Sequence, residues 1–521
     1  MADLVARAAT GRPGHTALIW QDQRLSWAEL DQRVDALARG LAALDLAPSQ
    51  GHPARVAIVL PNVPEFAQAY FAVLRAGLIA VPVNPGYTAR ELGHVLGDAQ
   101  AAVLIAGPGG LAAAQRSGAA PAHRYAVGAT VPAGAVPLAE LARTGAAGDP
   151  VVPATGGEDV AVLVYTSGTE GHPKGAMLSH RALLANHEQL ARIQPPPVRS
   201  DDVVLLALPL FHVFGLNSAL GAVAYHGATG VLVERFEPAE TLRLIAVHEV
   251  STVVGVPPMY VAWSLLPELA EEFASVRLAV CGAAPLDQAA SRRFLEVTRH
   301  PVVEGYGLTE TAPVLTSGLA SPVPKSGSIG RPVPGVSLKL VGAGGEEIDV
   351  DEDEDDDHAG GSPGTDPGEI VARGDNLFSG YWPDGREGPD PDGWWATGDV
   401  AYADADGDLF LVDRLRELIL VSGFNVYPYE VEQVLTAHPV VVEAAVLGVP
   451  HPYTGQAVKA FVVTREPIGE GELLAYCERN LARFKCPGAV EFVAALPHSA
   501  IGKVRKAALR AGGTESGGTR D

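Results

Sequence analysis

The chain has 521 residues, of which 47% are hydrophobic and 19% are charged, a composition typical of a packed globular protein with more than one domain. Lys and Arg number 38 against 61 Asp and Glu, which gives a formal net charge of −23. So acidic a surface repels phosphate backbones and excludes general nucleic-acid binding, although a local pocket of backbone N–H groups can still hold a nucleotide.

Cysteine usage and hydropathy indicate the compartment. Three cysteines stand far apart, without a CxxC pair or zinc-ligand spacing, so a reducing environment fits: Cys281, Cys477 and Cys486. Residues 1–9 lack the apolar core of a secretory signal. The apolar stretch 211–233 is interrupted by polar residues and glycines, so we interpret it as buried helix, turn and strand. We therefore expect a cytoplasmic protein without a transmembrane segment.

The first 300 residues alternate helix-like and strand-like patterns. Residues 25–44 repeat apolar side chains at helical spacing, and Ser26 with Glu29 forms a capping-box pattern. Apolar runs predict buried strands at 55–60 and 79–83, and a helix at 64–75 separates them. A strand, helix and strand of these lengths predict parallel α/β layers. The same alternation predicts further strands at 203–208, 230–233, 252–256 and 279–281.

One glycine-rich segment in this region resembles a dinucleotide fingerprint only loosely. Residues 107–112 read GPGGLA and follow the apolar run 101–106. No Asp or Glu stands about 20 residues further on to bind a ribose. We interpret the segment as a strand-to-helix turn.

The character of the chain changes after Gly335. Predicted strands at 336–341, 369–373 and 409–412, joined by turn residues, indicate a β-rich subdomain. The seven consecutive acidic residues at 351–357 predict a solvated loop, because a continuous run lacks the spaced ligands and glycine of a calcium loop. From residue 415 onward a small α+β unit is expected, with helices at 429–437 and 470–479 and strands at 441–446 and 457–464.

The strongest chemical signal is the segment 165–175, YTSGTEGHPKG, which follows an apolar strand at 160–164. Glycines let backbone N–H groups approach phosphate oxygens, hydroxyls donate further hydrogen bonds, and Lys174 neutralises charge. A Walker loop is the competing interpretation, but Pro173 stands where that pattern needs glycine and Gly175 where it needs Ser or Thr. The segment therefore predicts a polyphosphate loop of another kind.

This loop resembles the phosphate loop of the adenylate-forming superfamily, which includes acyl-CoA synthetases, aryl-CoA ligases, peptide-synthetase adenylation domains and beetle luciferases. The resemblance covers nearly the whole chain and is strongest to fatty acyl-CoA ligases. Further motifs follow in the family's order: PLFH at 209–212, CGAAPL at 281–286, EGYGLTE at 304–310, WATGD at 395–399, DRLRE at 413–417, SGFNVYP at 422–428 and PHSAIGK at 497–503.

The resemblance implies an α/β fold with two domains. A large N-terminal domain of stacked α/β layers plus a β-rich subdomain would span residues 1–413. A small mobile α+β C-terminal domain would span 414–521, with a hinge near Arg416.

The resemblance also implies roles for individual residues. Catalysis would involve Lys503, His212, Glu310 and Thr166, and Glu310 with Thr166 would hold Mg²⁺. Asp399 would accept bonds from the ribose hydroxyls, and Tyr306 would stack on adenine. The full set expected to contact ATP or coenzyme A is Thr166, Ser167, Gly168, Thr169, Lys174, Gly282, Ala283, Ala284, Glu304, Gly305, Tyr306, Gly307, Thr309, Asp399, Arg414, Gly423, Phe424 and Asn425.

The implied reaction is ATP-dependent acyl-CoA ligation. A carboxylic acid reacts with ATP to give acyl-AMP and pyrophosphate, and the acyl group then passes to coenzyme A. A medium- or long-chain fatty acid is the expected substrate. Two alternatives stay open within this chemistry: an aryl-acid CoA ligase, and an adenylating enzyme that loads a carrier-protein thiol. A non-catalytic nucleotide binder is disfavoured by the intact Lys174, Glu310, Asp399, Arg414 and Lys503.

Overall fold

The chain forms two units in the computed structural model. The first consists of Met1–Ser337 and Arg373–Trp395, and the second of Leu338–Ala372 and Ala396–Asp521. The structure describes residues 1–146, 151–152, 155–166, 173–342, 344–348, 364–414, 417, 419–421, 424–451, 454–498 and 504–512. The acidic run at 351–357 lies outside the described residues. The predicted boundary at 413/414 and the hinge at Arg416 remain predictions.

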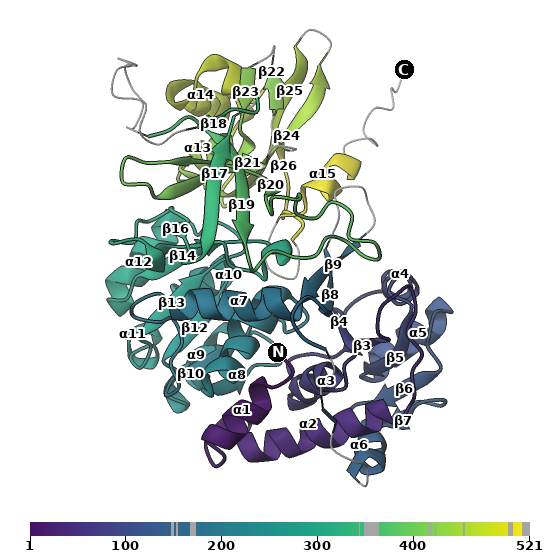
Figure 1. Ribbon diagram of the computed structural model, residues 1–521. Helices are drawn as coiled ribbons and strands as arrows, with labels where there is room; N and C mark the ends of the chain where they lie inside the picture. The colour runs from purple at the N-terminus through teal and green to yellow at the C-terminus, as the bar shows by residue number, and fades with distance from the viewer. Residues whose placement is uncertain are drawn as a thin grey trace. The chain divides into compact units, whose positions relative to one another are not determined.

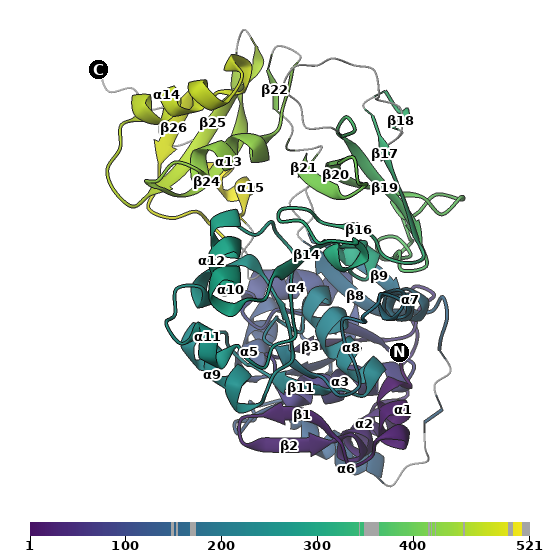
Figure 2. The ribbon, with the colours of Figure 1, turned by 90° about the vertical axis from the view of Figure 1, so that its left-hand side faces the viewer.

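A nine-stranded sheet occupies one side of the first unit, in the order β16-β15-β14-β13-β12-β10-β11-β1-β2. Strands β10 to β14 and β1 run parallel to one another, and Figure 2 shows β2 beside β1 at the end of the sheet, where the two pair antiparallel. The strands are β1 (Thr16–Trp20), β2 (Gln23–Ser26), β10 (Val203–Leu206), β11 (Thr229–Leu232), β12 (Thr252–Gly255), β13 (Leu278–Cys281), β14 (Val302–Tyr306), β15 (Thr316–Ser317) and β16 (Arg331–Pro332). The four strands predicted between residues 203 and 281 are thereby confirmed.

A seven-stranded sheet forms the other side of this unit, in the order β7-β6-β5-β3-β4-β8-β9. All its pairs are parallel except β8 with β9, which form an antiparallel hairpin. The strands are β3 (Arg55–Val59), β4 (Ile79–Pro82), β5 (Ala101–Ala106), β6 (His123–Ala126), β7 (Val136–Pro137), β8 (Val160–Thr166) and β9 (Lys174–Ser179). The predicted strand-to-helix turn at residue 107 is confirmed, because α5 (Pro108–Ser117) follows β5 directly.

Helices lie between and around the two sheets (Figure 1). The other helices of this unit are α1 (Leu4–Gly11), α2 (Trp27–Ala42), α3 (Pro64–Arg75), α4 (Ala89–Asp98), α6 (Leu138–Ala146), α7 (His180–Ala191), α8 (Ala222–His226), α9 (Pro238–Val247), α10 (Pro257–Trp263), α11 (Leu269–Glu272) and α12 (Gln288–Thr298). Helix α3 is buried from Phe66 to Arg75 and shares one hydrophobic core with Ile58 of β3 and Leu206 of β10. This shared core joins the two sheets into α/β layers.

The start of α2 shows how local sequence sets an element's boundary. Ser26 accepts a hydrogen bond from the backbone of Glu29, and the Glu29 carboxylate accepts one in return from Ser26 N, which satisfies two donors at the helix N-terminus. The predicted capping box is confirmed. The helix begins later than residue 25, because Leu25 pairs with Leu18 as the last part of β2.

The second unit contains two smaller sheets. One has the order β18-β17-β19-β20-β21 and the other the order β23-β22-β25-β24, with β26 paired to β25. The elements are β17 (Val336–Val341), β18 (Glu347–Ile348), β19 (Gly368–Gly374), β20 (Trp395–Ala403), β21 (Leu409–Arg414), β22 (Ile419–Val421), β23 (Phe424–Val426), α13 (Pro428–Thr436), β24 (Val441–His451), β25 (Gly455–Thr464), α14 (Glu470–Asn480), β26 (Ala489–Phe492) and α15 (Lys506–Gly512). The strands and helices predicted beyond residue 336 are confirmed, with shifts at their ends.

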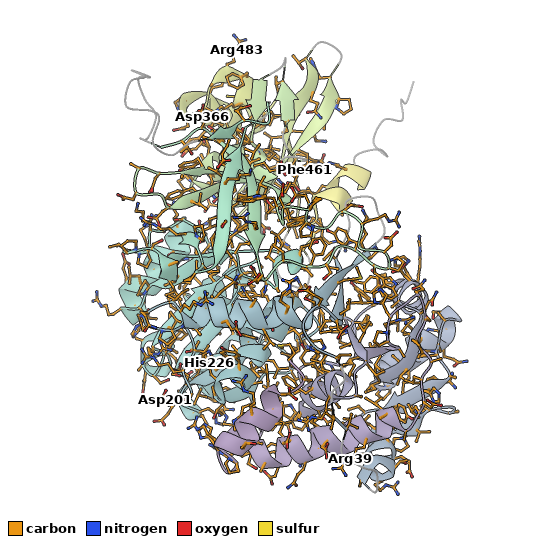
Figure 3. All side chains as sticks on the ribbon, viewed as in Figure 1. Arg39, Asp201, His226, Asp366, Phe461 and Arg483 are labelled. Atoms are coloured by element: carbon orange, nitrogen blue, oxygen red, sulfur yellow. The ribbon has the colours of Figure 1, made fainter. Side chains whose placement is uncertain are left out.

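The C-terminal elements have a hydrophobic core of their own. Val431 and Leu435 of α13 and Leu473 of α14 pack on one face of the sheet with Val446 and Val458. On the other face, a second cluster forms around Phe461, which is labelled in Figure 3, and includes Ala445, Leu447 and Leu496. The predicted fold class, a large α/β domain with a small α+β domain, is confirmed.

The segment 211–233 has the form expected from its sequence. It contains a π-helix (Phe214–Gly221), then α8, a left-handed turn at Gly227 and strand β11. Among the described residues, no helix combines the length and the hydropathy needed to cross a membrane.

Candidate active site

The parallel strands of the nine-stranded sheet end at one edge, and predicted site residues follow several of them directly. Gly282 to Ala284 follow β13, and Gly307 to Glu310 follow β14, its neighbour in register through Cys281 and Glu304. His212 follows β10, another strand of the same sheet, along the chain. Because carboxyl ends of parallel strands meet at one edge, the topology gathers these residues where α/β sheets bind ligands.

The turn after β13 requires small residues. A Cβ on Gly282 would lie 2.9 Å from Cζ of Phe214, so any larger residue at 282 would require the Phe214 ring to shift. Ala283 has a φ of 70°, a left-handed conformation that an alanine adopts only under constraint. The turn therefore presents backbone, not side chains, beside Phe214.

Glu304 holds this turn in place. One carboxylate oxygen accepts a hydrogen bond of 3.0 Å from Leu286 N, and the other accepts one of 3.0 Å from Gly327 N. Burial raises the pKa of Glu304, and the two backbone bonds oppose that shift. The described contacts of Glu304 thus anchor two loops.

The turn after β14 carries Glu310. A Cβ on Gly307 would lie 1.7 Å from the carbonyl oxygen of Pro313, so only glycine fits there. Thr309 and Glu310 then form a short 3₁₀-helix, and Glu310 is 6% exposed. Tyr306, the last residue of β14, is also buried, with 9% of its surface exposed. The tight turn therefore holds Glu310 in a buried position.

Buried amide side chains support the Glu310 turn from neighbouring elements. Asn217 of the π-helix donates 2.7 Å to Ala312 O and 3.1 Å to Leu183 O. Asn376 donates 2.7 Å to Thr311 O and 3.1 Å to Val314 O. Both side chains are at most 1% exposed, so these bonds lie in a low-dielectric interior and fix the turn firmly.

Tyr381 connects the Glu310 turn to the phosphate-loop hairpin. Its segment pairs with β9, because Trp382 N donates 2.8 Å to Gly175 O and Met177 N donates 3.0 Å to Gly380 O. The Tyr381 hydroxyl donates a 2.6 Å hydrogen bond to Oε1 of Glu310.

Lys174 lies near the ring of the same residue. Its Nζ lies 5.4 Å from the centroid of the Tyr381 ring and 2.7 Å from Oε1 of Glu387. The structure thus brings the predicted Lys174 and Glu310 onto one shared aromatic side chain. Tyr381 and Glu387 were not identified from the sequence, because they lie outside the motifs and act through contacts distant in the chain.

Helix α4 contacts both ends of the phosphate loop. The hydroxyl of Tyr165, on β8, donates 2.6 Å to Asp98, and Nε2 of His94 lies 3.1 Å from Pro173 O, just before β9. Burial and the bond to Asp98 raise the pKa of Tyr165 far above its usual range. Thr166 pairs with Lys174 at the base of the hairpin. Ser167, Gly168 and Thr169 lie outside the described residues.

His212 is positioned by its backbone at the start of the π-helix segment. Its N–H donates 3.0 Å to Pro209 O, and its carbonyl accepts 2.8 Å from Leu216 N. Burial lowers the pKa of His212 to about 4, so the imidazole is neutral at pH 7. A neutral ring suits the wall of an apolar pocket.

In the second unit, the structure pairs two of the predicted nucleotide residues. Asp399 of β20 lies opposite Arg414 of β21 in the antiparallel register, and Asp399 is 6% exposed. The backbone before it is held by a 2.9 Å bond from Gly398 N to the Glu369 carboxylate. Two residues expected to face a thiol path, Phe424 and Asn425, form β23.

Other predicted residues of this unit lie outside the described part of the chain: Arg416, Gly423 and Lys503. Among the described residues nearby, His498 and Val504 form an isolated antiparallel bridge.

The donor chemistry of Glu310 and Thr166 fits Mg²⁺. Both offer oxygen ligands, a carboxylate and a hydroxyl, which are the donors that this hard cation prefers. Glu310 is held by Tyr381 at one oxygen and by its short helix at the backbone, as a metal-ligating carboxylate is commonly held. Asp404, Asp406 and Asp408 also cluster, in a turn of the second unit where Asp404 accepts from the backbone N–H groups of both other residues.

Comparisons with known proteins agree along the chain. The family model described as AMP-binding enzyme matches residues 5–382, and that described as AMP-binding enzyme C-terminal domain matches residues 430–503. A feruloyl-CoA synthase from Amycolatopsis sp is 36% identical over 97% of both chains. A long-chain-fatty-acid–CoA ligase from Escherichia coli O157:H7 is 34% identical over 98% of this chain and 94% of the relative. The crystal structure of ATP-bound MatB from Rhodopseudomonas palustris aligns over 99% of both chains, with a TM-score of 0.86 and 32% identity.

Proposed function

The chain belongs to the AMP-binding enzyme family and is an acid–thiol ligase, and from that premise we propose that it joins a monocarboxylic acid with an apolar tail to coenzyme A. The acid forms an acyl-adenylate with ATP, pyrophosphate leaves, and the coenzyme A thiol takes the acyl group. A medium- or long-chain fatty acid is the proposed substrate.

We infer the class of acid from one observation, the amino-acid composition of the segments that follow β10, β12, β13 and β14. The segments 212–217, 256–259, 282–283 and 307–309 contain no Lys or Arg, so none of them offers a cation for a second carboxylate. Val256 and Met259 are buried in one hydrophobic cluster, and Phe214 packs against it. Such a lining favours an apolar tail, because burying apolar surface stabilises the complex while an unpaired carboxylate would be costly to desolvate.

In the proposed adenylation step, the chain's cations control charge. The acid carboxylate attacks the α-phosphorus of ATP, so two negative groups must approach each other. Lys174 offsets charge on the polyphosphate, and Lys503 bonds the carboxylate and an α-phosphate oxygen in the transition state. Glu310 and Thr166 would hold Mg²⁺, which supplies further neutralisation of phosphate charge when bound. The nucleophile is already ionised, so this step needs no general base.

An aryl acid is the second candidate substrate, and a specific observation favours it. The feruloyl-CoA synthase is as similar to this chain as the fatty-acid ligase is. The ring of Phe214, seated against Gly282, offers a flat surface on which an aromatic acid could stack.

The decisive experiment measures pyrophosphate release with ATP and Mg²⁺ across fatty, aryl and dicarboxylic acids, with and without coenzyme A, followed by mass analysis of the products. A fatty acyl-CoA supports the proposal, and an aryl-CoA supports the second candidate. Malonate or another dicarboxylate as the best substrate would overturn the apolar-tail assignment. Acyl-AMP that accumulates despite coenzyme A would identify a carrier-protein thiol as the acceptor.

A further inference from the structure

Lys174 of the phosphate-loop hairpin is held by a carboxylate of its own chain. Its ammonium nitrogen lies 2.7 Å from Oε1 of Glu387, and the two side chains are 33% and 57% exposed. The two residues are 213 positions apart in the sequence, so the contact arises from the fold alone. An anionic group therefore already occupies the lysine that the resemblance assigns to polyphosphate.

The backbone holds Glu387 firmly at this position. Its carbonyl oxygen accepts a 3.0 Å hydrogen bond from Nε1 of Trp395. Its φ of 57° is left-handed, which a glutamate adopts only where the surrounding structure imposes it. Tyr381 lies six residues before Glu387 in the sequence, in a segment that runs beside β9 (Figure 1). It pairs with Arg386 through a backbone bridge and closes the turn. Glu387 is thus presented to Lys174 by a constrained turn.

We propose that Glu387 is a positioning residue that competes with polyphosphate for Lys174 and so weakens the binding of both ATP and pyrophosphate. The proposal rests on the proposed function, because it takes the nucleotide site of that ligase as its setting. A phosphate oxygen that reaches the Lys174 ammonium meets a carboxylate beside the same nitrogen. The like charges repel, so the ion pair must loosen when polyphosphate binds and can re-form when pyrophosphate leaves.

This alternation of Glu387 and polyphosphate at Lys174 suits an enzyme that first forms an acyl-adenylate and then transfers the acyl group. Uniformly tight binding of polyphosphate would slow the departure of pyrophosphate, which must leave before a thiol reacts. Before ATP binds, the carboxylate also keeps the lysine near the Tyr381 ring, where the phosphate loop ends. The competition therefore lowers the affinity for ATP and pyrophosphate while it preserves the position of Lys174.

The test compares the wild-type enzyme with Glu387→Gln, which keeps the side-chain size and removes the charge. We expect ATP to bind about two- to fivefold more tightly to the variant, since exposed ion pairs contribute no more than this range. Pyrophosphate should inhibit the variant more strongly by a similar factor. Raising the ionic strength from about 0.05 M to about 0.5 M should shrink both differences, because salt screens exposed charges. A purely structural role would instead weaken ATP binding.

A matched control is Asp384→Asn. Asp384 lies in the same turn, is also exposed, and pairs with Arg386 at 2.9 Å, so its loss removes one negative charge without touching Lys174. Tighter pyrophosphate binding in Glu387→Gln but not in Asp384→Asn supports the proposal. Unchanged or weaker ATP binding in Glu387→Gln overturns it. Failure of the wild-type protein to bind ATP would instead overturn the proposed function, so the two failures are distinguishable by direct ATP titration of the wild type.

Discussion

The hydroxyl of Tyr381 donates a 2.6 Å hydrogen bond to the carboxylate of Glu310, a residue 71 positions earlier in the sequence. The same ring lies 5.4 Å from the ammonium of Lys174. One side chain therefore holds the carboxylate proposed to bind a metal ion and the lysine proposed to bind phosphate at a fixed separation. Such preorganisation matters because misplaced charges cost catalytic rate even when every group is present.

Replacing Tyr381 with Phe should test this relationship. The ring stays in place while the bond to Glu310 is lost, and a hydrogen bond to a charged group contributes about 1.5–3 kcal/mol. We therefore expect kcat/KM for Mg-ATP to fall by roughly 10- to 100-fold with little change in Tm. Steady-state kinetics and thermal unfolding measure both quantities.

A suitable control for that variant is Tyr125→Phe. Tyr125 lies in β6 of the same sheet, separated from β8 by three strands in the sheet order. It should leave kcat/KM for Mg-ATP unchanged. Equal loss of activity in both variants would contradict a specific role for the Tyr381 hydroxyl.

Asp399 should determine how strongly the enzyme prefers a ribose to a deoxyribose. If its carboxylate accepts the ribose hydroxyls, the wild-type enzyme should use ATP much better than 2′-deoxy-ATP. Asp399→Ala should raise the KM for ATP and reduce this preference towards unity, because the group that senses the hydroxyl is gone. Parallel kinetics with the two nucleotides measure the preference. A preference that survives the substitution would show that another residue binds the ribose.

Lys503 and Lys506 offer a matched pair for separating chemistry from stability. Lys503→Ala should abolish adenylation far more than it weakens ATP binding. Lys506, only 13% exposed, pairs with Glu417 at 2.9 Å and Glu432 at 2.8 Å. Lys506→Ala should therefore lower the free energy of unfolding, by about 1–3 kcal/mol, since Glu417 and Glu432 each lose a cationic partner. Pyrophosphate exchange and ATP titration measure the first effect, and denaturant unfolding measures the second. Equal loss of ATP binding and adenylation in Lys503→Ala would argue against its catalytic role.

Buried histidines should make the protein less stable in mild acid. Burial, and then the neighbouring His226, lowers the pKa of His187 to about 3, while an unfolded histidine titrates near 6.5. The unfolded chain therefore binds the proton first, so the stabilisation is complete above about pH 6.5 and declines as pH falls towards 3. The expected slope is up to about 1.4 kcal/mol per pH unit for this group.

Denaturant unfolding at several pH values measures that slope. Nε2 of His187 lies 2.9 Å from Oδ1 of Asn217, whose amide nitrogen already donates to two carbonyls, so the neutral imidazole donates from Nε2. His187→Gln keeps a donor for this bond and removes the titration. The variant should show a flatter dependence on pH, and an unchanged slope would assign the acid sensitivity to other groups.

Much of the fold could be predicted because its signals are local. The helix at 64–75 begins at Pro64 and ends at Arg75, as its sequence pattern predicted, and the Ser26–Glu29 capping box forms. Boundaries were less predictable where pairing intervenes, as at Leu25, whose partner Leu18 places it in a strand. The π-helix at Phe214–Gly221 was not predicted as such, and its Asn217 bonds carbonyls of α7 and of the Glu310 turn, contacts that are distant in the sequence.

The candidate site was predictable only where residues sit in motifs. Lys174 and Glu310 could be named from their segments, and the structure brings both to Tyr381. Tyr381, Asn376 and Glu387 could not be named, because they act through contacts that span 65 to 213 residues. The nucleotide contact of Glu304 stays a prediction from its motif, whereas its hydrogen bonds to the backbone of Leu286 and Gly327 could not be read from the sequence.

The π-helix has a thermodynamic consequence for how the two substrates assemble. Its first residue, Phe214, lies against Gly282, and its Asn217 bonds the carbonyl of Ala312, two residues beyond Glu310. In the proposed function the acid binds against Phe214, so it would contact the same element that supports the Glu310 turn. We therefore expect occupancy by the acid and occupancy by the nucleotide to be energetically linked, with each altering the affinity for the other by the same factor.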